Sequence, residues 1–143
     1  MATTGIRGFD TTIEKTNIWL KELMEEMDWD DREKAYTALR AVLQTLRDRL
    51  SLEEAVELGA QLPMLVRGFY FEGWNPAGKP VRYRTKEEFL WPIREAFRND
   101  PDIDVEQVAR AVYRVLRHRI SEGEISDILG ILPKPLRELW KSC

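Results

Sequence analysis

The sequence contains almost no cysteine or histidine, and this scarcity excludes several kinds of site. Cys143 is the only cysteine and His118 is the only histidine. A disulfide within the chain is therefore impossible, and so is a zinc site built from cysteines. A Ser-His-Asp or Cys-His catalytic arrangement would have to use one of these two residues, and no neighbouring motif orients either of them. We therefore predict no catalytic residues, and we expect a reducing, cytoplasmic location.

Long apolar runs and a strong net charge are also missing. No run approaches the about 18 residues that a membrane-spanning helix needs, and the N-terminus lacks the apolar segment of a signal peptide. The net charge of −3 does not favour general nucleic-acid binding. We therefore expect neither a membrane nor a nucleic-acid partner. Residues 1–74 contain 9 basic and 14 acidic residues, whereas residues 75–143 contain 13 and 11. The acidic half could therefore attract the basic half, within a chain or between chains.

Motifs that bind metals or phosphates are absent as well. There is no glycine-rich phosphate loop and no HExxH sequence. Asp28, Asp30 and Asp31 resemble a cation-binding loop only in their spacing, because the glycine and the distal glutamate of an EF-hand are missing. We predict no metal site, no cofactor and no enzymatic activity.

What the sequence does contain is an internal repeat. Residues 41–70 align without a gap with residues 111–140, at an offset of 70. Ten aligned pairs are identical: Ala41/Ala111, Val42/Val112, Leu46/Leu116, Arg47/Arg117, Arg49/Arg119, Ser51/Ser121, Glu54/Glu124, Leu62/Leu132, Pro63/Pro133 and Arg67/Arg137. Most other pairs exchange one apolar residue for another, which predicts one helical unit built twice.

Local signals predict about four helices in each unit. Capping boxes, in which a polar residue precedes a glutamate by three positions, mark five predicted helix starts: Thr11–Glu14, Asp30–Glu33, Ser51–Glu54, Thr85–Glu88 and Ser121–Glu124. Pro63 and Pro133 each predict a further start, because proline suits the first helical position. Apolar residues recur at helical spacing between these signals. Pro92 is expected to kink or split the helix after Thr85.

The resulting fold prediction is all-α, with about eight helices in two pseudo-symmetric four-helix repeats. The repeats cover roughly residues 11–74 and 85–141, and a linker of residues 75–84 joins them. The linker is rich in proline and glycine, which disfavours regular structure. We expect residues 1–143 to pack as one compact domain.

Six of the repeated residues are arginines that neither core packing nor capping explains. These residues are Arg47, Arg49, Arg67, Arg117, Arg119 and Arg137. One interpretation is structural, since a cation near a helix C-terminus interacts favourably with the last carbonyl groups. A second interpretation is a pair of equivalent anion or carboxylate sites that use the guanidinium fork. A third is contact with a partner.

A basic face occurs in the second half only. Arg110, Arg114, Arg117, His118 and Arg119 follow one another with no acidic residue between them. The face could simply be solvated. It could also dock on an acidic partner, including residues 22–33 of another copy, or contact nucleic-acid phosphates, which would require steep salt dependence.

An aromatic cluster flanks the linker. Its members are Phe69, Tyr70, Phe71, Trp74, Tyr83, Phe89 and Trp91. Because Phe69 to Trp74 cover more than one helix face, we expect some of them to pack the two halves together. Any exposed remainder would form a hydrophobic surface for a partner or ligand. The candidates for such an aromatic surface are Trp29, Trp74 and Trp91.

The repeated segment resembles a known family. The pattern consists of A-x-x-A-L-R-A-V-L-x-x-L-x-x-R-L-S at 35–51, E-A-x-x-L-x-x-Q-L-P at 54–63 and L-V-R-G-F-Y-F-E-G-W at 65–74. It resembles the bacterial and archaeal family catalogued as domain of unknown function 2267, over residues 9–140. The resemblance implies a soluble, all-helical, internally duplicated fold and carries over no catalytic or binding residues.

These observations favour a non-enzymatic helical module that binds protein and could form homo-oligomers. One alternative is a binder of an anionic ligand or nucleic acid through the Arg110–Arg119 face. Another is a binder of a small apolar ligand at the aromatic seam between the repeats.

Overall fold

The computed structural model describes residues 4–141 and is all-α, as predicted. Within these residues there are eight α-helices, one 3-10 helix and no strand. The helices are α1 (Arg7–Met27), α2 (Arg32–Arg49), α3 (Leu52–Gln61), α4 (Met64–Phe71), α5 (Lys86–Ala96), α6 (Val105–Arg119), α7 (Glu122–Ile131), α8 (Lys134–Arg137) and the 3-10 helix η1 (Glu138–Trp140). No helix between residues 4 and 141 is both long and apolar enough to cross a bilayer.

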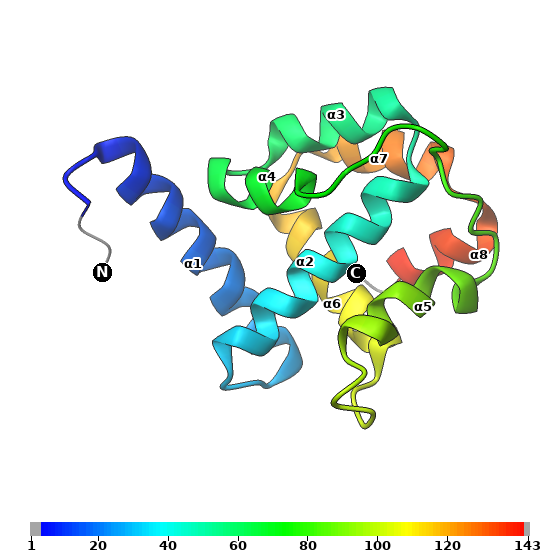
Figure 1. The fold of residues 1–143 in the computed structure, drawn as a ribbon, viewed down its shortest axis with the longest axis horizontal. Helices are drawn as coiled ribbons and strands as arrows, with labels where there is room; N and C mark the ends of the chain where they lie inside the picture. The colour runs from blue at the N-terminus through cyan, green and yellow to red at the C-terminus, as the bar shows by residue number, and fades with distance from the viewer. Residues whose placement is uncertain (1–3, 142–143) are drawn as a thin grey trace.

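Helices α2 and α6 form the centre of the domain (Figure 1). Each buries eight residues, and α2 contacts α1, α4, α5 and α6. The sequence pattern predicts an apolar stripe of Tyr36, Leu39, Leu43, Leu46 and Leu50 on the second helix. The four leucines are fully buried, as predicted, whereas Tyr36 at the start of the stripe is exposed. Burial of such a stripe supplies most of the stability of a helix in a globular protein.

Helices α3 and α7 lie side by side along one edge of the domain (Figure 1). Each follows a central helix after only two residues, Leu50–Ser51 in the first half and Ile120–Ser121 in the second. The contact between α2 and α6 therefore brings α3 close to α7. Because these two helices come from different halves of the chain, their contact joins residues about 70 positions apart.

Several helix boundaries recur at the offset of 70. Helix α3 starts and ends 70 residues before α7, and α4 starts 70 residues before α8. Helix α1 is the clear exception. Helix α5 begins at Lys86, which aligns with Thr16, whereas α1 begins at Arg7. Helix α1 therefore has nine additional residues at its N-terminal end, which we call the α1 extension (residues 7–15).

The predicted starts of the first two helices are wrong. Helix α1 does not begin at Thr11, because Asp10 in its first turn accepts a hydrogen bond from the Thr4 amide at 2.8 Å and supports an earlier start. Thr12 lies inside this helix and is buried. Helix α2 is capped by Asp31 rather than Asp30; the Asp31 side chain accepts hydrogen bonds from the amides of Glu33 and Lys34.

The proline predictions need smaller corrections. Pro63 and Pro133 are the N-cap residues of α4 and α8, one position before the predicted place. Pro92 does not split α5, which continues from Lys86 to Ala96. The capping box of Thr85 and Glu88 at the start of this helix is confirmed in both of its hydrogen bonds.

The contact between α3 and α4 depends on Gly59. A Cβ atom at this position would lie 2.6 Å from two ring atoms of Phe71. Gly130 is the second-last residue of α7, the helix that corresponds to α3, and a Cβ there would meet nothing within 4 Å. The two glycines thus both lie near the ends of corresponding helices but differ in their surroundings.

Alanine substitutions at these glycines should have opposite effects. We expect Gly59→Ala to lower the free energy of unfolding by about 1–3 kcal/mol, because the Phe71 ring must move. Gly130→Ala should raise it by up to about 1 kcal/mol through helix propensity. Urea unfolding of both variants measures the difference. A gain in stability for both would show that Phe71 moves without cost.

Candidate functional site

Arg47 is buried and binds backbone carbonyl groups. The residue is only 5% exposed. Its Nη1 atom donates hydrogen bonds to the carbonyl oxygens of Tyr70 at 2.8 Å and of Glu72 at 3.1 Å. These carbonyls lie at the C-terminal end of α4, where helix N–H groups no longer satisfy them. Nε also pairs with Asp48 Oδ1 at 2.9 Å. This arginine therefore joins α2 to α4 and supports the structural interpretation.

Arg67 and Arg137 also bind carbonyl groups, in equivalent positions. Arg67 donates through Nε to the Gly59 carbonyl and through Nη2 to the Leu62 carbonyl, each at 2.9 Å. Arg137 donates to the Leu132 carbonyl at 3.2 Å. In both halves an arginine thus satisfies the end of the preceding helix, a role that cations near helix C-termini commonly fill.

In the other two pairs of repeated arginines, Arg47/Arg117 and Arg49/Arg119, the two members have different binding partners. Arg117 donates to the carbonyl of Trp140 at 3.5 Å and lies over its ring, with Cζ 5.6 Å from the centroid. Arg49 donates to the Tyr83 carbonyl at 2.9 Å and so attaches the linker to α2. Its counterpart Arg119 instead pairs with Glu22 Oε1 at 2.7 Å.

The basic face of α6 lies against acidic residues of α1. Arg114 Nε lies 2.5 Å from Glu26 Oε2, and His118 Nδ1 contacts Glu22 Oε2. Arg110 pairs with Glu106 of its own helix and donates to the carbonyls of the C-terminal segment. The sequence offers residues 22–33 of another copy as a possible acidic partner of this basic face. In the structure, Glu22 and Glu26 of the same chain contact the face instead.

Only one of the three candidate tryptophans is largely exposed. Trp91 on α5 is 60% exposed. Trp29 and Trp74 are partly buried, because Trp29 packs on Phe97 with a centroid distance of 6.4 Å and Trp74 packs on Phe71 at 5.4 Å. The predicted aromatic surface of three tryptophans therefore reduces to Trp91.

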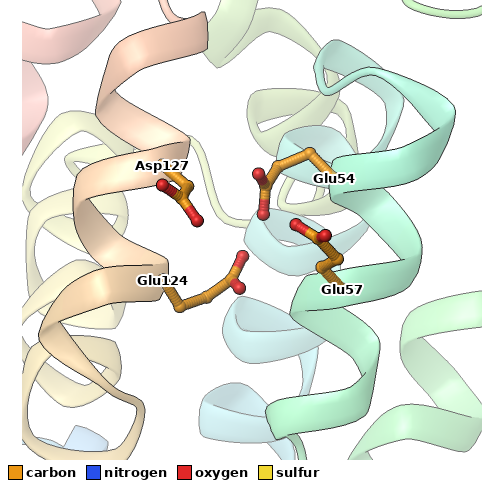
Figure 2. Close-up of side chains that lie close together, drawn as sticks. All are labelled: Glu54, Glu57, Glu124 and Asp127. Atoms are coloured by element: carbon orange, nitrogen blue, oxygen red, sulfur yellow. The ribbon is translucent and has the colours of Figure 1, made fainter.

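Four carboxylates meet where α3 and α7 run side by side. Glu54 and Glu57 come from α3, and Glu124 and Asp127 come from α7; we call these residues the carboxylate quartet. One oxygen from each residue lies within 4.8 Å of the others. Figure 2 shows the four side chains pointing toward one another from the two facing helices. Glu54 and Glu124 are buried, whereas Glu57 and Asp127 are exposed.

The local structure explains why the buried glutamates face one another. Ser51 and Ser121 cap their helices by accepting hydrogen bonds from the Glu54 amide at 3.2 Å and the Glu124 amide at 3.1 Å. The glutamate side chains do not return the bond to the serine amide, so these two predicted capping boxes are only half formed. The i, i+3 spacing then places Glu57 and Asp127 on the same faces as the buried residues.

The four carboxylates of the quartet repel one another strongly when they are ionised. Within residues 4–141, no basic side chain forms an ion pair with any of its members. Burial, together with the nearby Glu124 and Asp127, raises the pKa of Glu54 to about 8. Repulsion from Glu54 likewise raises the pKa of Glu57. Two unit charges about 4 Å apart repel by roughly 4 kcal/mol near a protein surface, so the four groups resist simultaneous ionisation.

Chemically, this arrangement can share protons or hold a cation. Carboxylates that share a site commonly retain a proton on one member. Carboxylate oxygens are also the preferred ligands of hard cations such as Ca²⁺, Mg²⁺ and Mn²⁺. From the sequence, a Ser-His-Asp or Cys-His site would need His118 or Cys143. In the structure, His118 contacts Glu22, and Cys143 lies outside the described residues.

The sequence contained a signal for the quartet that we assigned to capping. Glu54 and Glu124 are identical in the repeat, and both precede a second acidic residue by three positions. A capping box needs only the first of these acidic residues. The repeated acidic residue at Glu57 and Asp127 was therefore the feature that pointed to another role.

Comparison with known proteins identifies only a family. A family model described as "Uncharacterized conserved protein (DUF2267)" matches residues 16–139. No curated protein matches the chain. The matched residues begin at Thr16 and so leave out the α1 extension.

The structural role of Arg47 can be tested against a neighbour on the same helix. We expect Arg47→Ala to lower the free energy of unfolding by about 2–4 kcal/mol, because two carbonyl groups lose a charged donor. Arg40→Ala should cost less than about 1 kcal/mol, since Arg40 forms an exposed ion pair with Glu72 at 3.3 Å. Equal losses in urea unfolding would contradict a special role for Arg47.

The raised pKa of Glu54 predicts a pH-dependent stability. The folded chain binds the proton of this group more tightly than the unfolded chain, so the group's stabilising contribution is complete below pH 4.5 and is lost as the pH rises to about 8. The loss is at most about 1.4 kcal/mol per pH unit. Glu54→Gln should weaken this decline in urea unfolding without divalent cations.

The exposed Glu122 on α7 provides the control for the pH experiment. Glu122→Gln removes a carboxylate outside the quartet and should leave the pH dependence unchanged. If Glu54→Gln and the wild-type chain lose stability in parallel as the pH rises, Glu54 does not retain a proton in the folded state.

Proposed function

The chain belongs to the DUF2267 family of uncharacterised conserved proteins, and we propose that it is a non-enzymatic helical module that binds protein, in the first place a second copy of itself. The observation that carries this proposal is the α1 extension, a helix end with exposed apolar side chains that lies beside an apolar groove.

The α1 extension reaches beyond the rest of the domain (Figure 1). It consists of residues 7–15, which have no helical counterpart in the second half and lie outside the region that the family model matches. Ile6, Phe9 and Ile13 follow one another at i, i+3 and i+7, so they share one face of the helix. Ile6 is 51% exposed and Phe9 is 48% exposed.

Exposed apolar side chains are frequent on α1 and on α2 and α4, two of the helices that pack against it. Nine large apolar side chains are exposed among residues 4–141, and six of them belong to α1, its N-cap, α2 or α4: Ile6, Phe9, Ile18, Tyr36, Met64 and Leu65. Scattered single apolar residues are normal on a protein surface. Of these six, Tyr36 and Leu65 line one groove with Ile13 of the extension, so these two support a contiguous interaction site.

An apolar groove lies beside the extension, between α1, α2 and α4. It has a volume of about 480 Å³, and its apolar lining includes Ile13, Leu20, Tyr36, Leu65 and Phe69. The groove is formed by rigid elements, because the Leu65 amide donates to Thr12 Oγ1 at 2.8 Å and holds α4 on α1. A groove of this form accommodates an apolar helix face.

A second copy of the chain suits this surface for a geometric reason. The apolar helix end and the groove lie next to each other on one molecule, so a twofold-related pair can place each extension against the groove of the other copy. Charge does not oppose this packing, because Arg7 and Lys15 balance Asp10 and Glu14 in the extension. A stable interface of this kind buries about 1,200–2,000 Å² in total.

The two alternatives have less support. The arginines that would bind an anionic ligand or nucleic acid already contact carbonyl groups or the carboxylates of Glu22 and Glu26. At the aromatic seam, Phe71 and Trp74 pack on one another, so these rings are not free to enclose a small apolar ligand. Salt-dependent nucleic-acid binding would favour the first alternative over self-association.

Light scattering over a wide range of protein concentration tests the proposal. We expect the wild-type chain to form a dimer and Phe9→Glu to weaken it by roughly 30-fold or more, as loss of a central apolar anchor does. Folding should be unaffected, because the Phe9 side chain is already half exposed.

Trp91→Glu is the matched control, since Trp91 is also an exposed aromatic residue but lies on α5. It should leave the dimer intact. Loss of the dimer in the Trp91 variant alone would move the interface to α5, and a strict monomer at all concentrations would refute self-association.

A further inference from the structure

We propose that the carboxylate quartet of Glu54, Glu57, Glu124 and Asp127 is a binding site for a hard divalent cation, with Ca²⁺ as the ion of best fit. The site would join α3 to α7 and hence the first half of the chain to the second. It involves none of the residues of the α1 extension, so cation binding and self-association can be tested independently.

The chemistry of the ligands selects the class of cation. All four side chains offer carboxylate oxygens, and no histidine or cysteine lies among them. Oxygen-only sites favour Ca²⁺, Mg²⁺ and Mn²⁺ over softer metals, which prefer nitrogen and sulfur. Four carboxylates also supply enough negative charge to replace much of the hydration of a divalent ion.

The number of carboxylates favours the larger ion. One oxygen from each residue lies within 4.8 Å of the others. Ca²⁺ binds oxygen at about 2.3–2.6 Å, so ligands on opposite sides of the ion lie up to roughly 5 Å apart. Mg²⁺ dehydrates reluctantly, and it usually keeps several waters and takes only one or two protein carboxylates. A set of four carboxylates therefore suits Ca²⁺ better.

The two buried glutamates provide an independent indication of a ligand. Glu54 is 6% exposed and Glu124 is 7% exposed, and the Oε2 atom of each is buried without a hydrogen-bond partner. Both side chains point into the space between the helices (Figure 2). Buried polar atoms are nearly always satisfied by a partner, and such an exception needs an explanation. A cation bound between the carboxylates would supply the missing partner for both atoms.

The carboxylates of Glu54 and Glu124 take no part in capping their own helices. Ser51 and Ser121 accept the hydrogen bonds from the Glu54 and Glu124 amides. Neither glutamate side chain takes part in its cap, in contrast to Glu88, whose Oε1 accepts from the Thr85 amide at 3.0 Å. The carboxylates of Glu54 and Glu124 are thus available for an ion.

The exposed members of the quartet provide a route for the ion. Glu57 and Asp127 are exposed, so the site opens to solvent on one side. Ca²⁺ takes six to eight oxygen ligands, and water can complete the set on this open side. Because the ligands come from two helices that separate on unfolding, the ion would bind the folded chain and stabilise it by mass action.

Thermal unfolding and calorimetry test the site directly. The chain is first treated with a chelator and then titrated with CaCl₂, MgCl₂ or MnCl₂, with NaCl at matched ionic strength as the control for screening. We expect saturating Ca²⁺ to raise Tm by roughly 5–10 °C, Mg²⁺ to raise it less, and NaCl to have little effect. Isothermal titration calorimetry should give one Ca²⁺ per chain.

The variants are chosen so that folding is preserved. Glu57→Gln and Asp127→Asn change exposed ligands, and we expect each to lower the Ca²⁺ affinity at least tenfold. Without Ca²⁺ both variants should melt at or above the wild-type temperature, because each relieves repulsion. Glu122→Gln removes an exposed carboxylate of α7 outside the quartet and should change the affinity less than threefold.

Three results would overturn the proposal. The first is a Tm that responds no more to Ca²⁺ than to NaCl, with no binding heat. The second is an equal Ca²⁺ response in the wild type, Glu57→Gln and Asp127→Asn, which would place binding elsewhere. The third is a stronger response to Mg²⁺ than to Ca²⁺, which would overturn the choice of ion.

Discussion

The contact between α2 and α6 is the interaction on which the other features of the domain depend. These two helices bury the most side chains, and α1 and α5 each pack against both of them. Because α3 follows α2 and α7 follows α6 after only two residues, burial of the central pair also determines where the outer helices lie. The meeting of Glu54 and Glu124 is therefore a consequence of apolar packing elsewhere.

Two kinds of buried charge occur in this fold, and they differ in how they are compensated. The guanidinium of Arg47 binds the exposed carbonyl ends of a helix and an adjacent carboxylate, so its burial contributes to stability. The carboxylates of Glu54 and Glu124 face other carboxylates and form no ion pair with a basic side chain of residues 4–141. Repulsion between carboxylates that share a site is relieved when one of them keeps a proton or when a cation binds between them.

The second half of the chain is similar to the first in its local structure, and the departures from that similarity are informative. The α1 extension exists in the first half alone, and the acidic residues Glu22 and Glu26 pair with the basic face of α6. The similarity, by contrast, produces the quartet, since each half contributes two acidic residues three positions apart. Features present once and features present twice thus suggest different roles, a partner surface and a shared ligand site respectively.

Local sequence patterns predicted the number of helices and most of the core, although the starts of the first two helices were wrong. Apolar residues at helical spacing, such as Leu39 and Leu43, correctly predicted which faces are buried, because this periodicity reflects local geometry. The same local reasoning failed where a neighbour from another helix intervened. Thr85–Glu88 and Ser51–Glu54 have the same capping pattern, yet only Glu88 completes its box. The partners of the repeated arginines and the aim of Glu54 toward α7 were decided by the tertiary structure alone, because they depend on contacts between residues far apart in the chain.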